Sequence, residues 1–133
     1  MIAASSSSSS RSCSSFAQPL QSVLCGVVTT VAGSGNRESL DGVGIAAGFN
    51  YPAGIVKDWD GKMMYVADCE GHKIRSMCLA DGAVTTLAGN GDIGSANGVG
   101  AAATFNGPTD VAIGLDGKML YVADQWNLSL IHI

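Results

Sequence analysis

The stretch Asp60–Arg75, DGKMMYVADCEGHKIR, has a near-copy at Asp116–Ile131, DGKMLYVADQWNLSLI. The first ten residues of the two copies differ at two positions, whereas none of the last six match. The repeat extends in both directions, because Gly26–Met77 aligns with Gly82–Ile133 at a constant offset of 56 residues, with 24 identities in 52 pairs and no gap. Self-similarity at a fixed period is the signature of an architecture built from repeated structural units.

One repeat unit is predicted to form four short strands joined by tight turns. Asp60-Gly61 and Asp81-Gly82 favour hairpin turns, because glycine accepts a positive φ. The stretches between the turns are rich in Val, Ile, Tyr and Thr, which suit a pleated surface. The expected elements are an outer strand of an earlier unit at 27–32, a complete unit of strands 53–58, 63–68, 73–79 and 83–88, and a partial unit at 109–133.

The pattern of apolar residues and the period together predict the fold class. Both faces of the strands carry apolar residues, so both faces of each sheet are expected to be covered. Four-stranded antiparallel sheets that recur every 56 residues and stack face to face describe the blades of a β-propeller. The prediction is therefore an all-β fold, a partial β-propeller of four-stranded antiparallel blades. A β-sandwich is the alternative, but it gives no reason for a fixed sequence period.

Two Gly-rich linkers, residues 33–52 and 89–108, separate the units and are long for connections in a compact domain. Such length favours a functional loop or a short helical turn within it. The AAATF run at 101–105 is the candidate for that turn. We expect Phe105 to anchor the turn to the sheet, and Phe49 to do the same in the earlier copy.

The composition argues against two classes of binding partner, nucleic acids and membranes. The net charge is −4 and the seven Lys and Arg are scattered, so the clustered cations of a nucleic-acid site are not expected. No apolar run approaches the roughly 20 residues that a membrane span needs. Residues 1–25 are Ser-rich and predicted to be a disordered N-terminal segment, followed by the propeller region 26–133.

The four cysteines leave the redox compartment undecided. Cys69 and Cys78 flank a predicted hairpin but would be several residues out of step across it, so a disulfide between them is not expected. Isolated buried thiols are the favoured interpretation for all four.

The motifs VTTLAG, A-x-F-N-x-P, YVAD and GHKIR, taken together, resemble the NHL repeat of β-propellers in its longer form. The signature of that family is Asn-His-x-Ile/Val-Arg after a strand that ends in Asp. The resemblance covers roughly residues 26–127. In the first copy Gly71 replaces the Asn while His72, Ile74 and Arg75 match; in the second, Asn127 matches while Leu128, Leu130 and Ile131 stand where His, Ile and Arg belong.

The resemblance implies a scaffold that binds proteins, sometimes RNA or small ligands. A minority of related propellers are enzymes, such as metal-dependent lyases and lactone hydrolases. It also implies more blades than this chain holds, so we expect a fragment of a longer protein or a chain that assembles with others, with the remaining blades of the parent propeller as partners. The final LSLIHI abandons the repeat and resembles translated adapter or frame-shifted sequence.

Asp68, His72 and Arg75 form the strongest polar constellation, and Asp124 repeats Asp68. They could form a ligand site or a catalytic relay. A structural role is favoured, because a residue repeated in every blade is seldom a unique active site. In that interpretation Asp68 and Asp124 cap the turn after their own strands, and Arg75 pairs with a carboxylate of its own or a neighbouring blade.

Two weaker motifs are interpreted as loops. Gly89–Gly94 matches G-x-G-x-x-G, but a dinucleotide site also needs a helix there, which Gly98 and Gly100 oppose. Asp58 and Asp60 faintly match a calcium loop, yet a hairpin turn explains them. No catalytic residue, metal site or cofactor is predicted.

The sequence therefore favours a non-catalytic binding scaffold whose Gly-rich linkers face a protein partner from one rim. The alternative is part of a propeller enzyme with a metal in its central channel. That alternative needs acidic or His residues at the start of each first strand, where only Asp110 qualifies. The candidate rim residues are Asn36, Asp41, Asn90, Asp92 and Asn97.

Overall fold

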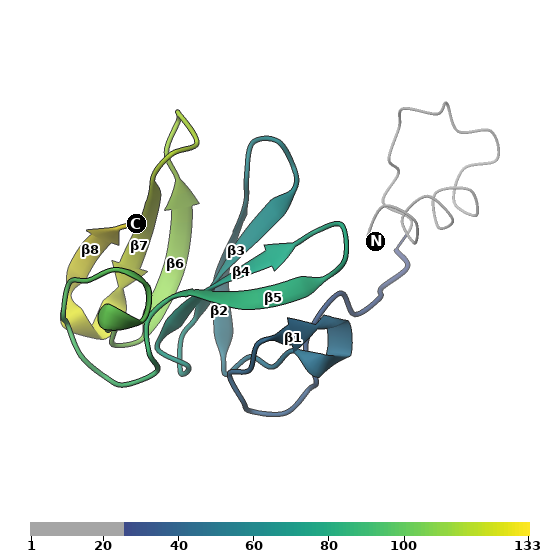
Figure 1. The fold of residues 1–133 in the computed structure, drawn as a ribbon, viewed down its shortest axis with the longest axis horizontal. Coiled ribbons are helices and arrows are strands. Elements are labelled where there is room, and N and C mark those ends of the chain that lie inside the picture. The colour runs from purple at the N-terminus through teal and green to yellow at the C-terminus, as the bar shows by residue number, and fades with distance from the viewer. Residues whose placement is uncertain (1–25) are drawn as a thin grey trace.

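The computed structural model describes residues 26–133, and the Ser-rich segment 1–25 lies outside the described residues. Two antiparallel sheets stand side by side and are joined by one long linker, residues 89–107 (Figure 1). The described part has no α-helix, and none of its short helical turns has the length and apolarity of a membrane-crossing helix. The predicted all-β fold of partial-propeller type is confirmed.

The first sheet, here called the first blade, holds four strands that pair antiparallel in chain order. A fifth, very short strand from the linker 33–52 pairs with the outer edge, placing Gly42 opposite Val84. Both predicted Gly turns form, since Gly61 and Gly82 have φ of 73° and 74°. The strands are β1 (Gly42–Val43), β2 (Pro52–Lys57), β3 (Met63–Asp68), β4 (Lys73–Cys78) and β5 (Ala83–Ala88), in the spatial order β1-β5-β4-β3-β2.

The second sheet, here called the second blade, repeats the first three strands of the first blade. Its strands are β6 (Pro108–Ile113), β7 (Leu120–Asp124) and β8 (Ser129–His132), in the order β6-β7-β8. The first pair of each blade carries a register shift at the same place, just after Pro52 and just after Pro108. The sequence repeat is therefore also a repeat of strand pairing.

Each linker contains a single 3-10 turn at the same position of the repeat. These turns are η1 (Gly44–Ala46) and η2 (Gly100–Ala102), and a third, η3 (Gln125–Asn127), joins β7 to β8. The predicted turn in the AAATF run is thus present, one residue earlier than expected. Phe105 is buried after η2, which confirms its anchoring role, and Phe49 packs against the equivalent face of the first blade.

The main core lies between the two blades. β2 and β3 of the first blade pack against β6 of the second, and the second linker closes one side with Phe105. Because both blades contribute a face to this core, neither sheet has two wet faces. The buried members are Ala67, Ile74, Ala88, Ala103, Phe105, Val111, Leu120 and Val122.

The predicted outer strand at 27–32 is wrong for this structure, since those residues form no ladder. A strand is stabilised by its hydrogen-bonded neighbour, and no described strand pairs with this segment. Val27 and Val28 are accordingly exposed, although segment 27–32 shares four of its six residues with β5. The sequence pattern shows that residues 27–32 favour an extended strand, but it does not show whether a neighbouring strand is present to pair with them.

Cys69 and Cys78 are free thiols at opposite ends of the β3–β4 hairpin, as predicted from the register. Burial, with the negative charges of Glu70 and Asp68, raises the pKa of Cys69 above its ordinary value. Because the thiolate is the nucleophile, this raised pKa lowers the fraction of Cys69 in the reactive form. Cys13 and Cys25 lie outside the described residues.

Candidate functional site

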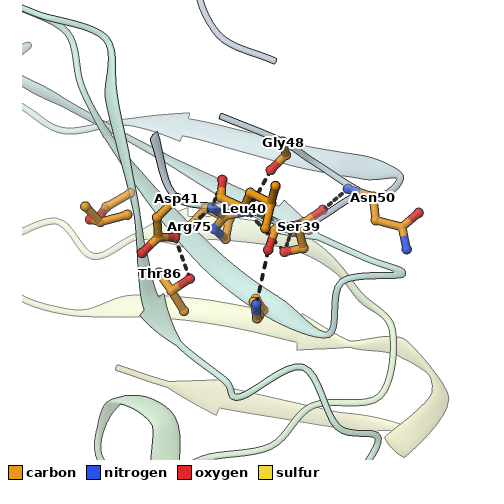
Figure 2. Close-up of polar contacts among 11 residues, drawn as sticks. Ser39, Leu40, Asp41, Gly48, Asn50, Arg75 and Thr86 are labelled. Atoms are coloured by element: carbon orange, nitrogen blue, oxygen red, sulfur yellow. Dashed lines mark hydrogen bonds and ion pairs between the residues drawn. The ribbon is translucent and has the colours of Figure 1, made fainter. Parts of the chain in front are cut away.

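Arg75, in the middle of β4, is fully buried and is the centre of a polar cluster (Figure 2). Its Nη1 donates to Oδ2 of Asp68 at 3.0 Å and to Oγ of Ser39 at 3.1 Å. Its Nη2 donates to Oδ1 of Asp41 at 2.8 Å. The backbone carbonyls of Gly48 and Leu40 accept the remaining bonds, at 2.9 and 2.7 Å. We call Ser39, Asp41, Asp68 and Arg75 the Arg75 cluster.

The cluster fastens the first linker to the first blade. Asp68 and Arg75 come from adjacent strands of the blade, whereas Ser39 and Asp41 come from the linker that crosses it. The ring of Phe49 lies 5.4 Å from the guanidinium and covers its face. Among residues 26–133, Nε of Arg75 has no hydrogen-bond partner. A fully buried cation is tolerable only with such partners, since charge is costly to desolvate.

Asp68 is saturated by donors that lie far away in sequence. Its Oδ1 accepts from the backbone amide of Asn50, and its Oδ2 from Oγ of Ser39, both at 2.6 Å. The prediction that Asp68 caps the turn after its own strand is therefore wrong. The Asp68 carboxylate instead accepts hydrogen bonds from the linker that leads into β2. Asp124 accepts the amide of Asn106 in the same way, at 2.8 Å, and also bonds to Asn127 of the turn after its own strand. The prediction that Arg75 pairs with carboxylates is confirmed.

Asp41 is the exposed member of the cluster. Burial raises its pKa, but hydrogen bonds from Thr86 and the hydrogen bond and charge of Arg75 outweigh burial, so the pKa lies below the ordinary 3.8. Oγ1 of Thr86 donates to Asp41 at 2.9 Å, which extends the cluster to β5. Asp41 was predicted as a rim-binding residue, and the structure shows that this exposed carboxylate also bonds to Arg75.

The second blade satisfies its aspartate with a different side chain. Ile131 stands at the position of Arg75, and Nδ2 of Asn127 donates to Oδ2 of Asp124 at 2.6 Å and to the carbonyl of Gly94 at 2.7 Å. Gly71 occupies the Asn127 position in the first blade. A Cβ there would lie 2.6 Å from Oδ2 of Asp68 and 2.8 Å from Oγ of Ser39, so the position leaves no space for a side chain.

His72 connects the two blades and takes no part in the Arg75 cluster. Its Nδ1 accepts the backbone amide of Gly107 at 3.1 Å, and its ring lies 6.4 Å from that of Trp126. His72 has φ of 50°, and Leu128 repeats this left-handed conformation with φ of 52°. Both copies of the repeat therefore share the left-handed backbone conformation. The hydrogen bond to the Gly107 amide is made by the His72 side chain, which Leu128 does not reproduce.

The other predicted rim residues are exposed on the linkers. Asn90 and Asp92 bond to each other, with Nδ2 to Oδ2 at 3.0 Å and the amide of Asp92 to Oδ1 of Asn90 at 2.8 Å. Asn97 lines a groove beside β8, and Asn36 lines a second groove near Tyr51. The structure does not bring the five candidates together into one site.

The weaker motifs are turns, as predicted. The Gly89–Gly94 segment is followed by linker and not by a helix. Asp58 and Asp60 both accept the backbone amide of Lys62, at 2.8 and 3.2 Å, which closes the hairpin. Across the described part of the chain, no group of three His, Cys, Asp or Glu is placed to hold a metal ion. Asp110 accepts its own neighbour's amide, that of Val111, at 2.9 Å.

Sequence reasoning missed Ser39 and the amides of Asn50 and Asn106. A signal was present for the two amides, because the Asn-x-Pro stretch of Asn50 recurs at Asn106, and both amides donate to the aspartate that ends the second strand of their unit. Ser39 recurs as Ser95, but among the contacts of the described residues only Ser39 bonds to its aspartate.

Several known proteins resemble the chain, although no protein-family profile matches it. NHL repeat-containing protein 2 of Bos taurus is 41% identical over 91 residues, which are 66% of this chain and 12% of that protein. The protein of the same name from Homo sapiens is 40% identical over 89 residues, again 66% of this chain and 12% of that protein. Protein SUPPRESSOR OF QUENCHING 1, chloroplastic, of Arabidopsis thaliana is 33% identical over 99 residues, covering 72% of this chain and 9% of that protein.

Solved structures share the architecture. An auxiliary nutrient binding protein from Bacteroides thetaiotaomicron superposes with a TM-score of 0.66 and 28% identity, over 77% of this chain and 28% of that one. A protein of unknown function from the same organism gives 0.68 and 30%, over 76% and 26%.

Repeated antiparallel blades, packed face to face and each held to its linker through a buried aspartate, define this chain as part of a β-propeller scaffold. With the relatives above, the chain belongs to the NHL-repeat β-propeller family. It spans about 12% of the length of the first of these relatives.

Proposed function

We propose that this propeller segment is a non-catalytic binding scaffold, and that the two linkers present its contact surface to a protein partner. One observation carries the proposal: both linkers keep the same hydrogen-bonded frame while their exposed side chains differ. Gly33 donates to the carbonyl of Gly44 at 3.1 Å, and Gly89 to that of Gly100 at 3.0 Å. A rigid frame with variable side chains is the usual form of a recognition surface.

The frame is the same in the middle of the linkers. Arg37 forms an isolated parallel bridge with Phe49, and Ile93 forms the equivalent bridge with Phe105. The bridge positions therefore carry a cation in one linker and an aliphatic side chain in the other. Both residues are exposed, Ile93 by 67%.

The first linker carries the more characteristic contact pair. Nη2 of Arg37 donates to the hydroxyl of Tyr51 at 2.7 Å, and its guanidinium lies 4.8 Å over the Tyr51 ring. Tyr51 is about half exposed. Tyr and Arg are enriched among the residues that dominate protein–protein binding energy. The net charge of −4 argues against a nucleic-acid ligand, and a solved neighbour of this architecture is described as an auxiliary nutrient binding protein.

Phage display tests the proposal with a library of random peptides panned against the immobilised chain. Enriched peptides are then measured against two double variants. Arg37→Ala with Tyr51→Ala removes the contact pair, whereas Leu115→Ala with Lys118→Ala changes exposed residues of the hairpin between β6 and β7. We expect the first variant to lose tenfold or more in affinity, about 1.4 kcal/mol, and the second to bind as the parent does.

Two outcomes would overturn the proposal: no peptide enriched above an unrelated protein, or equal loss in both variants. Turnover of lactone or ester substrates with added Mg²⁺, Ca²⁺ or Zn²⁺ would instead support the propeller-enzyme alternative.

A further inference from the structure

Two side-chain hydrogen bonds of the described residues join the first blade to the second, one near each end of β3. At one end, Nε1 of Trp59 donates to the carbonyl of Gly114 at 3.0 Å. At the other end, Nδ1 of His72 accepts the amide of Gly107 at 3.1 Å. Because the six residues of β3 separate them, the two contacts lie about 20 Å apart, on the two rims of one junction.

The Trp59 contact is made by groups that do not titrate. An indole N–H is a donor only, and a backbone carbonyl is an acceptor only. The Trp59 ring also packs on the hairpin of the second blade, since a Cβ at Gly117 would lie 2.9 Å from Cδ1 of Trp59. The β2–β3 and β6–β7 loops that carry this contact lie at the same end of the two sheets (Figure 1). A change of pH therefore leaves this end of the junction closed.

The His72 contact needs a neutral imidazole. An amide nitrogen only donates, so Nδ1 must be the acceptor and the ring proton must lie on Nε2. A protonated imidazole carries a proton on both nitrogens, which makes Nδ1 a donor as well. Nδ1 and the amide nitrogen of Gly107 would then be two donors that face each other. The hydrogen bond and the second proton therefore exclude each other.

The surroundings of Gly107 leave little room for another acceptor. Gly107 is buried, and a Cβ there would lie 2.7 Å from Cε3 of Trp126, so the indole covers this residue closely. His72 itself is 8% exposed. A buried amide without an acceptor is unfavourable, and water reaches this one only if the indole moves away. Loss of the bond therefore favours movement of η3, which carries Trp126, away from His72.

Most of the charged groups around His72 bond to other partners. The titratable residues of the segments packed against it are Asp68, Cys69, Glu70, Lys73 and Arg75 of the first blade, Asp92 of the second linker and Asp124 of the second blade. Asp68 and Arg75 pair with each other, the two other aspartates accept asparagine side chains, and Lys73 donates to a backbone carbonyl. No salt bridge among residues 26–133 includes His72. The bond to Gly107 is therefore the contact of the imidazole that protonation changes.

We propose that the junction between the blades is an acid-operated hinge, which opens at the His72 end while the Trp59 contact keeps the other end closed. The imidazole of His72 is the sensor, and η3 with Trp126 is the part that moves. Histidine suits this role because an ordinary imidazole gains its second proton at about pH 6.5, well above the range of ordinary carboxylates. Protonation of histidine at an interface is an established form of switch. The end that opens lies beside the second linker, since a Cβ at Gly89 would meet the carbonyl oxygen of His72.

The two tryptophans of the chain, one at each end of the hinge, allow the ends to be observed separately. Fluorotryptophan incorporated at both positions of the full chain gives two fluorine NMR signals, and Trp126→Phe identifies which signal belongs to Trp126. Between about pH 7.5 and about pH 5.5, where histidine titrates, the Trp126 signal should shift with a single proton transition. The Trp59 signal should shift by less than about a tenth as much over the same range.

Two matched variants separate the hydrogen bond from the charge. In His72→Asn, Oδ1 can accept the Gly107 amide, the residue type tolerates the left-handed φ of 50°, and no proton can be gained. The Trp126 signal of this variant should no longer respond to pH in that range. His132→Ala removes the other histidine of the chain and should respond as the parent does. Circular dichroism at neutral pH should show that both variants keep the β-sheet of the parent.

Three results would overturn the hinge: a Trp126 signal of the parent that stays in place, equal movement of both signals, or a folded His72→Asn chain that responds as the parent does. If His72→Asn does not fold, the parent and His132→Ala still decide. A response that is lost in His132→Ala would assign the proton transition to His132 and overturn the role of His72, whereas a response that is kept supports it.

Discussion

Nη1 of Arg75 lies 3.0 Å from Oδ2 of Asp68, and neither side chain has any exposed surface. The pair joins adjacent strands of the first blade, and Ser39 of the linker bonds to both partners. The two hydrogen bonds of Ser39 therefore fix the first linker to the first blade. Either buried ion would destabilise the fold if its partner were removed, because both Arg75 and Asp68 have lost their hydration.

Asp68→Ala should lower the free energy of unfolding by about 3–5 kcal/mol, since it leaves the Arg75 cation buried without its main partner. Urea unfolding at a fixed protein concentration measures the effect. Asp60→Ala is the matched control, because Asp60 pairs with Lys62 on the surface and its loss should change the unfolding midpoint little. Equal shifts in the two variants would show that burial does not control the strength of the Arg75 pair.

Acid should weaken the attachment of the first linker through Asp41. The pKa of Asp41 in the folded chain is below the ordinary 3.8, so the folded state binds fewer protons than the unfolded state as the pH falls. The stability from this group is therefore fully present above pH 3.8 and is lost as the pH falls through the lowered pKa. Urea midpoints measured down to that range should fall more steeply with acid for the parent than for Asp41→Asn. Parallel curves for the two proteins would exclude this contribution.

His72→Ala should destabilise the junction between the blades by about 1–3 kcal/mol, because the buried amide of Gly107 loses its acceptor. Thermal and urea unfolding both measure the loss. The second histidine supplies the control: His132 is exposed at the end of β8, and its replacement by Ala should leave unfolding unchanged. If His72→Ala were as stable as His132→Ala, the Nδ1 contact would have no energetic role.

Gly71→Ala should cost about 1–3 kcal/mol through overpacking. A Cβ at Gly71 would lie 2.6 Å from Oδ2 of Asp68 and 2.8 Å from Oγ of Ser39. At Gly114 the nearest atom, Oδ1 of Asp116, is 3.3 Å away on a side chain that can move, so Gly114→Ala should be tolerated. Denaturant unfolding of the two variants side by side decides the matter, and a stable Gly71→Ala chain would mean that the Arg75 cluster can rearrange.

The strands of the complete blade could be predicted because their signals are local. Asp60-Gly61 marks the turn between β2 and β3, and Asp81-Gly82 marks the turn between β4 and β5. The 56-residue period then predicts β6 to β8 at the equivalent positions of the second blade. The predicted bounds differ from the observed ones by one residue at most for the four strands of the complete blade. The burial of Phe105 was also predicted, because Phe105 follows the expected turn within the linker and Phe49 recurs at the same place in the earlier copy.

Features that depend on distant partners could not be predicted in this way. Segment 27–32 has the composition of a strand, yet strand formation needs a neighbour that no local pattern reports. β1 is two residues long, Gly42–Val43, and exists because β5 offers it an edge. The donors to Asp68 come from positions 18 and 29 residues earlier, so its role could not be inferred from the turn beside it.

The linker groups that surround Arg75 are synthesised before Arg75 itself. The groups that the guanidinium contacts in the linker precede it by 27 to 36 residues. On a ribosome, the acceptors are therefore synthesised before the cation that they will surround. The first blade can therefore meet acceptors that are already synthesised when Arg75 emerges, so synthesis from the N-terminus shortens the time for which the bare charge competes for other partners.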